Sequence, residues 1–277
     1  MEKKSVFGAG LDSVSTWEDM ASDYVDRVNH SSYHSARLVM VNSLIPRELY
    51  SRGKVVFDFG CGDGVLLLPF LDAGAEAFGC DPSEEMIGYA RKRFAERGTK
   101  PDGLLLGGVE QLAAQKTASL DAVLAFNVLA YLTDAEETEF YAQLKRAVRP
   151  GGYFAVTHSN ELFDLFTANR YTVEFLAKHF VDDPATASRL GSLFTNPDKP
   201  QSQDRYNVRE NPLVYPNKLD RLGFKVVKTG YHNWHKAPPV LKEQVTYPST
   251  ASVPSSEQWK LMFTCSTYGV CAQRANS

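Results

Sequence analysis

Ten consecutive residues, Val55 to Gly64, constrain the fold of this chain more than any other segment. The first five are apolar apart from one aspartate, and glycine then occupies alternate positions up to Gly64. An apolar run of this kind is typical of a buried parallel strand. Because glycine has no Cβ, alternate glycines let the backbone turn sharply and lie directly against a ligand. The pattern predicts a strand, a ligand-binding turn and then a helix between Val65 and Leu71.

The spacing of the acids and glycines indicates which ligand this turn binds. A nicotinamide-binding turn reads Gly-x-Gly-x-x-Gly, whereas this one reads Asp58-x-Gly60-x-Gly62-x-Gly64. A pyrophosphate binds best to helix-end amides without a negative charge nearby. Asp58, together with Asp63 inside the turn, therefore argues against a pyrophosphate and favours a ligand with a cationic end.

A second strand is predicted from Gly74 to Asp81, which stands 21 residues after Gly60. An acid at the tip of this strand is suited to accept hydrogen bonds from the two hydroxyls of a ribose. The turn and this acid are the first two sites that the sequence places at the carboxyl ends of neighbouring strands.

These residues resemble the first two motifs of the class I S-adenosylmethionine-dependent methyltransferases. Asp58, Gly60, Gly62 and Gly64 match the fixed positions of the first motif, and Asp81 matches the second. The resemblance implies an α/β fold with a Rossmann-like, seven-stranded, mostly parallel sheet flanked by helices. It also implies that the glycine turn carries the methionine end of S-adenosylmethionine and that Asp81 holds the ribose.

The rest of the chain supplies further strands and helices in alternation, which predicts a parallel sheet with right-handed crossovers. Thr133 and Glu136 form a capping box for a helix that ends at Ala147. The resemblance places the last strand antiparallel beside the sixth. Further strands are expected at residues 104–106, 119–127, 153–158, 224–231 and 260–273, and further helices at 17–28, 35–44 and 84–97.

Loops after the third and fourth strands add candidate cofactor contacts, because ligands of open parallel sheets sit outside the carboxyl ends of the strands. The resembling family commonly has an adenine-binding acid directly after the third strand, whereas this chain has glycines there and Glu110 slightly later. Tyr24 lies in an N-terminal helix that resembles the family's cofactor cover, and Met86 is either a core residue or an adenine contact. The expected cofactor-binding residues are Tyr24, Asp58, Gly60, Cys61, Gly62, Asp81, Pro82, Met86, Gly108, Val109, Glu110, Asn127 and Val128.

Between Ser159 and Leu219 the alternation stops. Helices are expected at residues 161–168 and 172–180, followed by the polar stretch from Thr195 to Gln203. We interpret this insertion as a lid that binds the acceptor, since loops at this end of a sheet carry specificity. The expected organisation is a helical cover over residues 1–50, a cofactor-binding half over 51–159, the lid over 160–219 and the C-terminal strands of the same domain over 220–277.

Methyl transfer from a sulfonium is an in-line displacement that depends on alignment of the reacting groups. A hydroxyl acceptor also needs a base, for which histidine is suited near neutral pH; an amine need only be unprotonated, and a carboxylate needs no base. His158, at the tip of the fifth strand, is the first candidate for that base, although a substrate-binding or structural role stays open. His232 and His235, expected just after the sixth strand, are the next candidates. No acidic partner of matching spacing accompanies these two histidines, so no metal is expected.

The composition limits the partners. A net charge of −3 gives no electrostatic reason to expect nucleic acid, and no apolar stretch is long enough to cross a bilayer. The four cysteines lack metal-type spacing, which favours a reduced, cytoplasmic protein in which Cys61 and Cys80 are buried fillers. A monomer or a homodimer is expected.

Three hypotheses on function follow. The first is an enzyme that methylates a small molecule, with a hydroxyl of a sugar or secondary metabolite as first choice and an amine or carboxylate as alternatives. The second is a protein or RNA methyltransferase, against which the acidic balance argues. The third is a non-catalytic scaffold, which would not need the intact motif residues Asp58, Gly60, Gly62 and Asp81. The sequence does not identify the acceptor.

Overall fold

A computed structural model describes residues 21, 32–179, 183–186, 188, 191, 209–236, 238–239, 246–247 and 253–276. The chain forms two compact units. Unit 1 contains residues 1–158, 216–230 and 269–277, and unit 2 contains residues 159–215 and 231–268. The expected helix at residues 17–28 and the polar stretch from Thr195 to Gln203 lie outside the described residues, Ala21 excepted.

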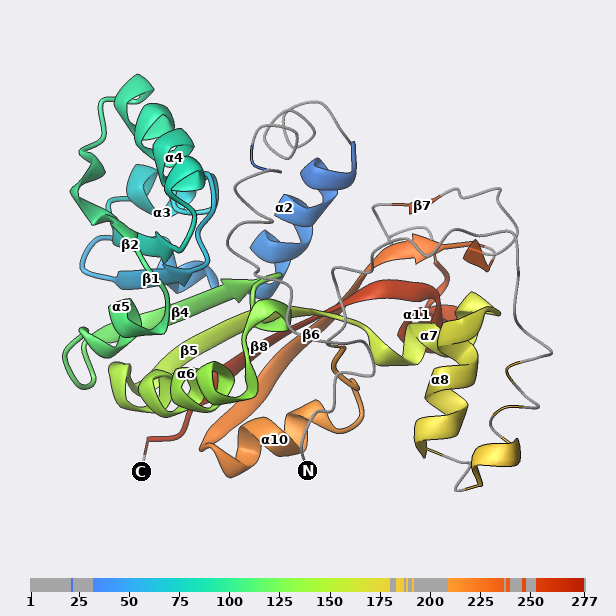
Figure 1. Ribbon diagram of the computed structural model, residues 1–277. Helices are drawn as coiled ribbons and strands as arrows, with labels where there is room; N and C mark the ends of the chain where they lie inside the picture. Colours follow the sequence, from blue (N-terminus) through green and yellow to red (C-terminus); the bar gives the residue numbers. More distant parts are fainter. Residues whose placement is uncertain are drawn as a thin grey trace. The chain divides into compact units, whose positions relative to one another are not determined.

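The predicted strands are present in one sheet of order β3-β2-β1-β4-β5-β8-β6-β7 (Figure 1). The first five strands of this order, from β3 to β5, pair in parallel with one another. The seven predicted strands are joined by β7, a strand of 2 residues that pairs antiparallel with β6. The bounds are β1 Val55–Phe59, β2 Glu76–Asp81, β3 Leu104–Leu106, β4 Leu120–Phe126, β5 Val148–Ser159, β6 Phe224–His235, β7 Thr246–Tyr247 and β8 Cys265–Arg274.

The last strand, β8, runs antiparallel between β5 and β6, as the resemblance implied. The side chain of Gln273 donates to the carbonyl of Gly151 (3.0 Å), whereas the amide of Asn160 donates to Ser266 (3.0 Å). Residue numbers therefore increase along β5 while those of the facing residues in β8 decrease, as in an antiparallel pair.

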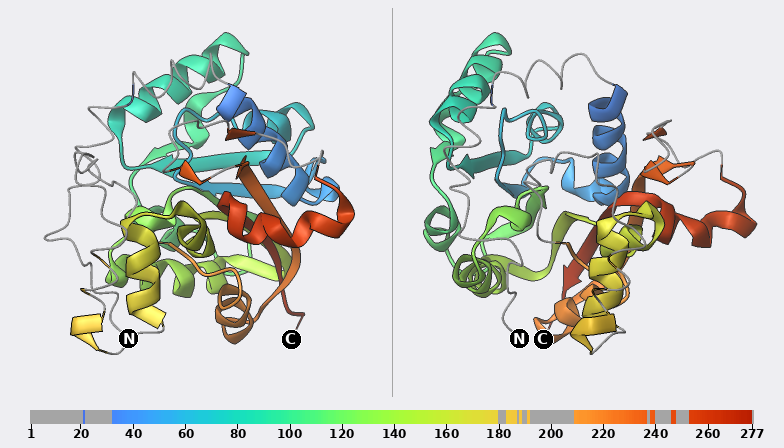
Figure 2. Two further views of the ribbon diagram at one scale, coloured as in Figure 1. Left: turned by 90° about the vertical axis from the view of Figure 1, so that its right-hand side faces the viewer. Right: turned by 45° about the vertical axis from the view of Figure 1, so that its right-hand side comes forward.

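The helices of unit 1 follow their sequence signals. In α6 the side chain of Thr133 accepts from the Glu136 amide, and Glu136 accepts from the Thr133 amide (2.8 Å), which confirms the capping box. Helices α3 and α4 lie on one face of the sheet and α5 and α6 on the other, an arrangement that Figure 2 shows from two further directions. The described helices are α2 Ser32–Leu44, α3 Leu68–Asp72, α4 Glu84–Glu96, α5 Val109–Ala113, α6 Asp134–Ala147, α7 Asp164–Thr167, α8 Arg170–His179, α10 Tyr215–Arg221 and α11 Leu261–Thr264.

Several element boundaries differ from prediction. Strand β5 begins at Val148 rather than at residue 153, and helix α3 begins at Leu68 rather than at residue 65. The helix expected at residues 161–168 is a 3-10 turn over Glu161–Phe163 followed by α7.

The two C-terminal strands differ as well. Strand β6 continues to His235, so His232 and His235 lie within the strand rather than after it. The left-handed backbone of Asn233 (φ 56°) interrupts the alternation of side chains, which is how β6 accommodates this polar end. The final strand begins at Cys265 rather than at residue 260, because residues 261–264 form the short helix α11.

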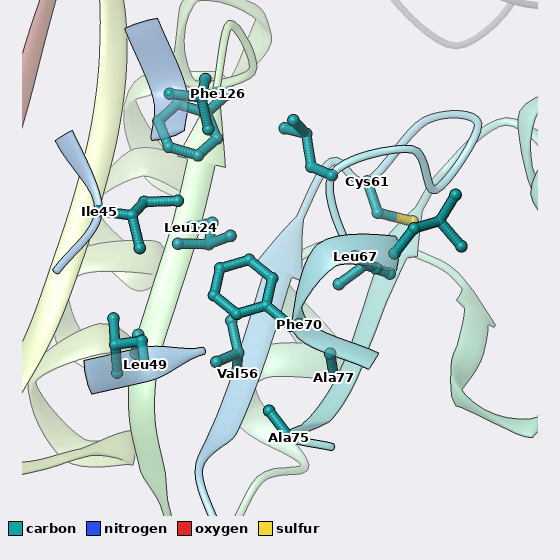
Figure 3. Packing of buried hydrophobic residues seen from close by; sticks show 14 of the residues in the cluster. Ile45, Leu49, Val56, Cys61, Leu67, Phe70, Ala75, Ala77, Leu124 and Phe126 are labelled. Carbon is teal, nitrogen blue, oxygen red and sulfur yellow. The ribbon is translucent and has the colours of Figure 1, made fainter. Parts of the chain in front are cut away.

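A hydrophobic core in unit 1 holds α3 against the sheet (Figure 3). Phe70 of α3 is 1% exposed and points toward Val56 of β1 and Leu124 of β4. Its ring also stacks on Tyr50, with the ring centroids 4.3 Å apart. Truncating a buried phenylalanine costs about 3–5 kcal/mol, so this packing fixes both ends of the segment that contains the glycine turn.

Candidate active site

The glycine turn after β1 has the backbone that its sequence predicts. Gly60, Gly62 and Gly64 adopt left-handed φ angles of 74°, 53° and 72°. A Cβ on Gly60 would lie 2.5 Å from Cγ2 of Val128, so only glycine permits this close approach. The amides of Gly60 and Cys61 donate to the carbonyl of Cys80 at 2.8 Å and 2.9 Å, which anchors the turn to the end of β2.

Asp81 connects the tip of β2 to this turn. Its Oδ2 accepts from the Gly62 amide (2.9 Å) and its Oδ1 accepts from the Ser83 amide (3.0 Å). Burial raises the pKa of the Asp81 carboxyl, and the two backbone hydrogen bonds oppose that rise. A carboxylate has about four acceptor positions, so each oxygen keeps the capacity to accept from a ligand hydroxyl. Asp81 is therefore held in a fixed orientation suited to a diol.

The two acids near the turn have different roles. Asp58 is 1% exposed at the end of β1, and Asp63 is 3% exposed within the turn. The Oδ2 of Asp63 lies 2.6 Å from the Arg93 guanidinium of α4, and its Oδ1 accepts from the Val65 amide (3.3 Å). The charge of Asp63 is thus balanced inside the unit. Of the two acids that favoured a ligand with a cationic end, Asp63 therefore stabilises the turn through these contacts within unit 1.

The loop after β3 is tied to the same strand end. The Gly107 amide donates to the Asp81 carbonyl (3.0 Å), and Cys80 Sγ lies 3.6 Å from the Gly108 carbonyl. Glu110 belongs to the first turn of α5, where its Oε1 accepts from the Gly108 amide (2.7 Å). The carboxylate that the sequence offered as an adenine contact therefore also organises its own loop.

Three further candidates surround the turn. Cys61 and Cys80 are buried, as predicted, and burial raises the pKa of both thiols, so they pack as protonated fillers. Met86 is 3% exposed in α4, and a Cβ on Gly62 would lie 3.1 Å from its methyl group. Met86 therefore packs directly against the glycine turn.

A residue that the sequence did not single out supports the loop after β4. Asn127 has a left-handed φ of 56°, and its amide donates to Oγ1 of Thr157 (3.0 Å). The Thr157 hydroxyl in turn donates to Oδ1 of Asn127 (2.8 Å). A threonine directly after the apolar residues Phe154 to Val156 of β5 was the available signal, but only the parallel pairing of β4 with β5 brings it to Asn127.

The candidate histidines fall in different units. His158 is buried near the end of β5 in unit 1, whereas His232 and His235 belong to β6 in unit 2. Burial lowers the pKa of both His232 and His235, which favours their neutral forms. The ring of His235 lies 4.7 Å from that of Phe163, centroid to centroid.

Unit 1 thus brings most of the predicted cofactor residues to the carboxyl ends of neighbouring strands. The contacts described above connect β1 to β2, β2 to the loop after β3, and β1 to the loop after β4. Tyr24 lies outside the described residues. The residues placed at these strand ends and the loops and helix that follow them are Asp58, Gly60, Cys61, Gly62, Asp81, Pro82, Met86, Gly108, Val109, Glu110, Asn127 and Val128.

A family model described as a methyltransferase domain matches residues 56–152, the segment that contains the glycine turn, Asp81 and Asn127. The chain carries a methyltransferase domain. Two solved structures share the fold of this methyltransferase domain and of the segments around it. Magnesium protoporphyrin IX methyltransferase from Synechocystis PCC 6803, with bound SAH, is 16% identical with a TM-score of 0.56, covering 95% of this chain and 98% of that chain. A SAM-dependent methyltransferase from Archaeoglobus fulgidus is 16% identical with a TM-score of 0.55, covering 91% and 99%. The class I fold predicted from the sequence is confirmed.

Two curated proteins similar to the methyltransferase domain have the same name. The ubiquinone biosynthesis O-methyltransferase of Aromatoleum aromaticum is 33% identical over 134 residues, which are 48% of this chain and 56% of the relative. The protein of that name from Vibrio atlanticus is 28% identical over 151 residues, which are 54% of this chain and 62% of the relative. The chain therefore spans little more than half the length of these relatives.

The described part of the chain contains no group of three or more histidine, cysteine, aspartate or glutamate side chains placed to hold a metal ion. Across the same residues, every helix is too short or too polar to cross a membrane.

Proposed function

We propose that this protein transfers a methyl group from S-adenosylmethionine to a small-molecule acceptor. The observation that carries the proposal is the carboxylate of Asp81, which the amides of Gly62 and Ser83 hold at the tip of β2 beside a left-handed glycine turn. This arrangement offers fixed acceptors for a ribose diol and, next to them, backbone without side chains.

The residues present fit this cofactor by their chemistry. Asp81 would accept from the ribose hydroxyls, and the buried carboxylate of Asp58 lies at the end of β1, where the ammonium group of the methionine end would be stabilised. Met86, Val109 and Glu110, which follow β2 and β3, would line the adenine side. When bound, the cofactor supplies an electrophilic sulfonium methyl group.

A hydroxyl is the acceptor group that we propose. The relatives named ubiquinone biosynthesis O-methyltransferase support this choice, since their name places the transferred methyl group on an oxygen. His158 would take the proton of the acceptor hydroxyl, and His232 or His235 would do so if His158 does not. We further propose that residues 160–219 bind the acceptor as a lid, and that the protein acts in the cytoplasm, where its four buried free cysteines stay reduced.

Calorimetry with S-adenosylhomocysteine tests the proposal through Asp81. The Asp81→Ala protein should bind with an affinity weakened by about 1–3 kcal/mol, because charge-assisted hydrogen bonds to the ribose are lost. Asp102→Ala, which removes an exposed acid of the same unit, is the matched control and should bind normally. Unchanged affinity of the Asp81→Ala protein would exclude this cofactor site.

The acceptor is identified by a screen. Wild-type protein is incubated with S-adenosylmethionine and separate pools of sugars, phenols, amines and carboxylic acids, and products are detected by a mass increase of one methyl group. Methylated sugars or phenols support the proposed hydroxyl acceptor. Methylation confined to amines or carboxylic acids contradicts it.

A further inference from the structure

Thr157, like its neighbour His158, is a polar residue in a buried stretch of β5, and Thr157 has no role in the function proposed above. It is 2% exposed and lies opposite Phe126 in the parallel pairing of β4 with β5. A buried hydroxyl is costly unless it is hydrogen-bonded. Both of the hydrogen bonds described for Thr157 go to one residue, Asn127, the first residue after β4.

These two bonds fix the backbone of Asn127. A left-handed conformation costs roughly 1–2 kcal/mol for a residue other than glycine, and asparagine tolerates it best. By accepting the Asn127 amide proton, Thr157 satisfies a donor that this turn directs into the sheet. The next residue, Val128, is then held against Gly60. A Cβ added at Gly60 would lie 2.5 Å from the side chain of Val128. From β5, Thr157 therefore fixes the position of Val128, which packs against the glycine turn.

The same bonds fix the orientation of the Asn127 side chain. A threonine hydroxyl has one proton. The oxygen of Thr157 accepts from the backbone amide of Asn127, and the Thr157 hydroxyl donates its proton to the carbonyl oxygen Oδ1 of the Asn127 side chain. The Nδ2 end of the side-chain amide points away from Thr157 and offers two N–H donors. Such a group binds an oxygen of a ligand and does not accept from an ammonium group.

The strand order indicates which oxygen that is. Neighbouring strands run β2-β1-β4, so Asp81 and Asn127 stand on opposite sides of the glycine turn. A cofactor whose ribose binds Asp81 extends across the turn with its amino-acid end toward the loop after β4. This step depends on the proposed function, because it assumes that the cofactor is S-adenosylmethionine.

We propose that Thr157 is a positioning residue: it orients Asn127 so that the side-chain N–H groups of Asn127 bind the carboxylate of the cofactor. Thr157 does not touch the cofactor itself. Hydrogen bonds to a charged group are worth about 1.5–3 kcal/mol, which corresponds to a change in affinity of about tenfold or more.

The test compares two ligands and four variants by calorimetry. S-adenosylhomocysteine has the amino-acid end, whereas 5′-methylthioadenosine lacks it and keeps the nucleoside. Thr157→Val, which is nearly isosteric but lacks the hydroxyl, should weaken S-adenosylhomocysteine about tenfold and leave methylthioadenosine within twofold. Thr157→Ser keeps the hydroxyl and should bind both ligands as wild type does. Circular dichroism verifies that each variant is folded at the temperature of the titration.

Asn127→Gly keeps the left-handed backbone and removes the amide, so it should lose a similar amount of S-adenosylhomocysteine affinity. Adding Thr157→Val to Asn127→Gly should then cause no further loss, because Thr157 acts through Asn127. Additive losses, equal losses for both ligands, or full affinity in Thr157→Val would each overturn the positioning role. If wild-type protein binds neither ligand, the proposed function itself fails, which is a separate result.

Discussion

His158 is the residue at which proton transfer is most directly tested. If the acceptor is a hydroxyl, His158→Ala should lower turnover by about a hundredfold or more while cofactor affinity stays within a few fold, because the loss falls on proton transfer. In His158→Ala, the pH–rate profile should also lose the limb that arises from deprotonation of the base. Single-turnover kinetics and calorimetry on the same preparation measure the two quantities.

His158→Gln is the control, since glutamine keeps a hydrogen-bonding side chain that cannot take a proton. It should be as slow as His158→Ala. If His158→Gln keeps full turnover, His158 only binds or packs, and His232 and His235 are tested next. Their lowered pKa keeps them neutral and able to accept a proton. If all three are dispensable, the acceptor is an amine or a carboxylate.

Single residues of the candidate site were predictable where one short motif contains the whole signal. The glycines of the turn were found because three left-handed positions leave a pattern within five residues. The pairing of Asp63 with Arg93 was not, because 30 residues separate them and only the packing of α4 brings them together. The bond between Asn127 and Thr157 likewise depends on the register of two strands.

At the scale of elements, the short helix α7 contains an acid whose titration should affect stability. Asp164 is 6% exposed, and its Oδ2 lies 2.9 Å from Nε of Arg209. Burial raises the pKa of Asp164 to about 7; Arg209 opposes the rise, and Glu161 and Glu174 add to it. Because the folded-state pKa is raised, the folded protein holds this proton more tightly than the unfolded chain does.

The contribution of Asp164 to stability is therefore fully present below the unfolded pKa of about 4 and is lost as pH rises through about 7. Between pH 5 and pH 7 we expect the free energy of unfolding to fall by roughly 2 kcal/mol on account of Asp164. Urea titrations of wild type and Asp164→Asn measure it, and the variant should lack this part of the slope. Asp102→Asn controls for an exposed acid. Identical slopes in wild type and Asp164→Asn would contradict the assignment.

The elements themselves were largely predictable, and the exceptions have local causes. Strong signals such as the capping box of α6 gave a correct helix start. The end of β6 was misplaced because His232 and Asn233 are polar and read as a loop, although both are less than 6% exposed in the structure. The start of β8 was misplaced because Leu261 and Met262 are as compatible with a strand as with the short helix α11.

At the scale of the whole molecule, the alternation of strands and helices predicted a parallel sheet, because each parallel strand needs a crossover. The seven-stranded, Rossmann-like form of that sheet was implied by the resemblance to the class I methyltransferases. The division into two units could not be predicted in this way. Strands β5, β6 and β8 each begin in one unit and end in the other, so no linker in the sequence marks the boundary. Such a boundary depends on tertiary contacts, which the sequence pattern does not contain.

The proposed lid is tested by limited proteolysis of the full chain. Apart from two prolines, the stretch from Asn196 to Gln203 contains only polar side chains, so it can bury little apolar surface, and a protease should cut near it first. Lys199 precedes a proline, which makes Arg205 the tryptic site to monitor. Binding of cofactor and acceptor together should slow the cut at Arg205 several-fold, because an acceptor held by residues 160–219 would order them. Arg205→Gln identifies the band by removing it. Equal cutting rates with and without both ligands would show that this insertion does not close on the acceptor.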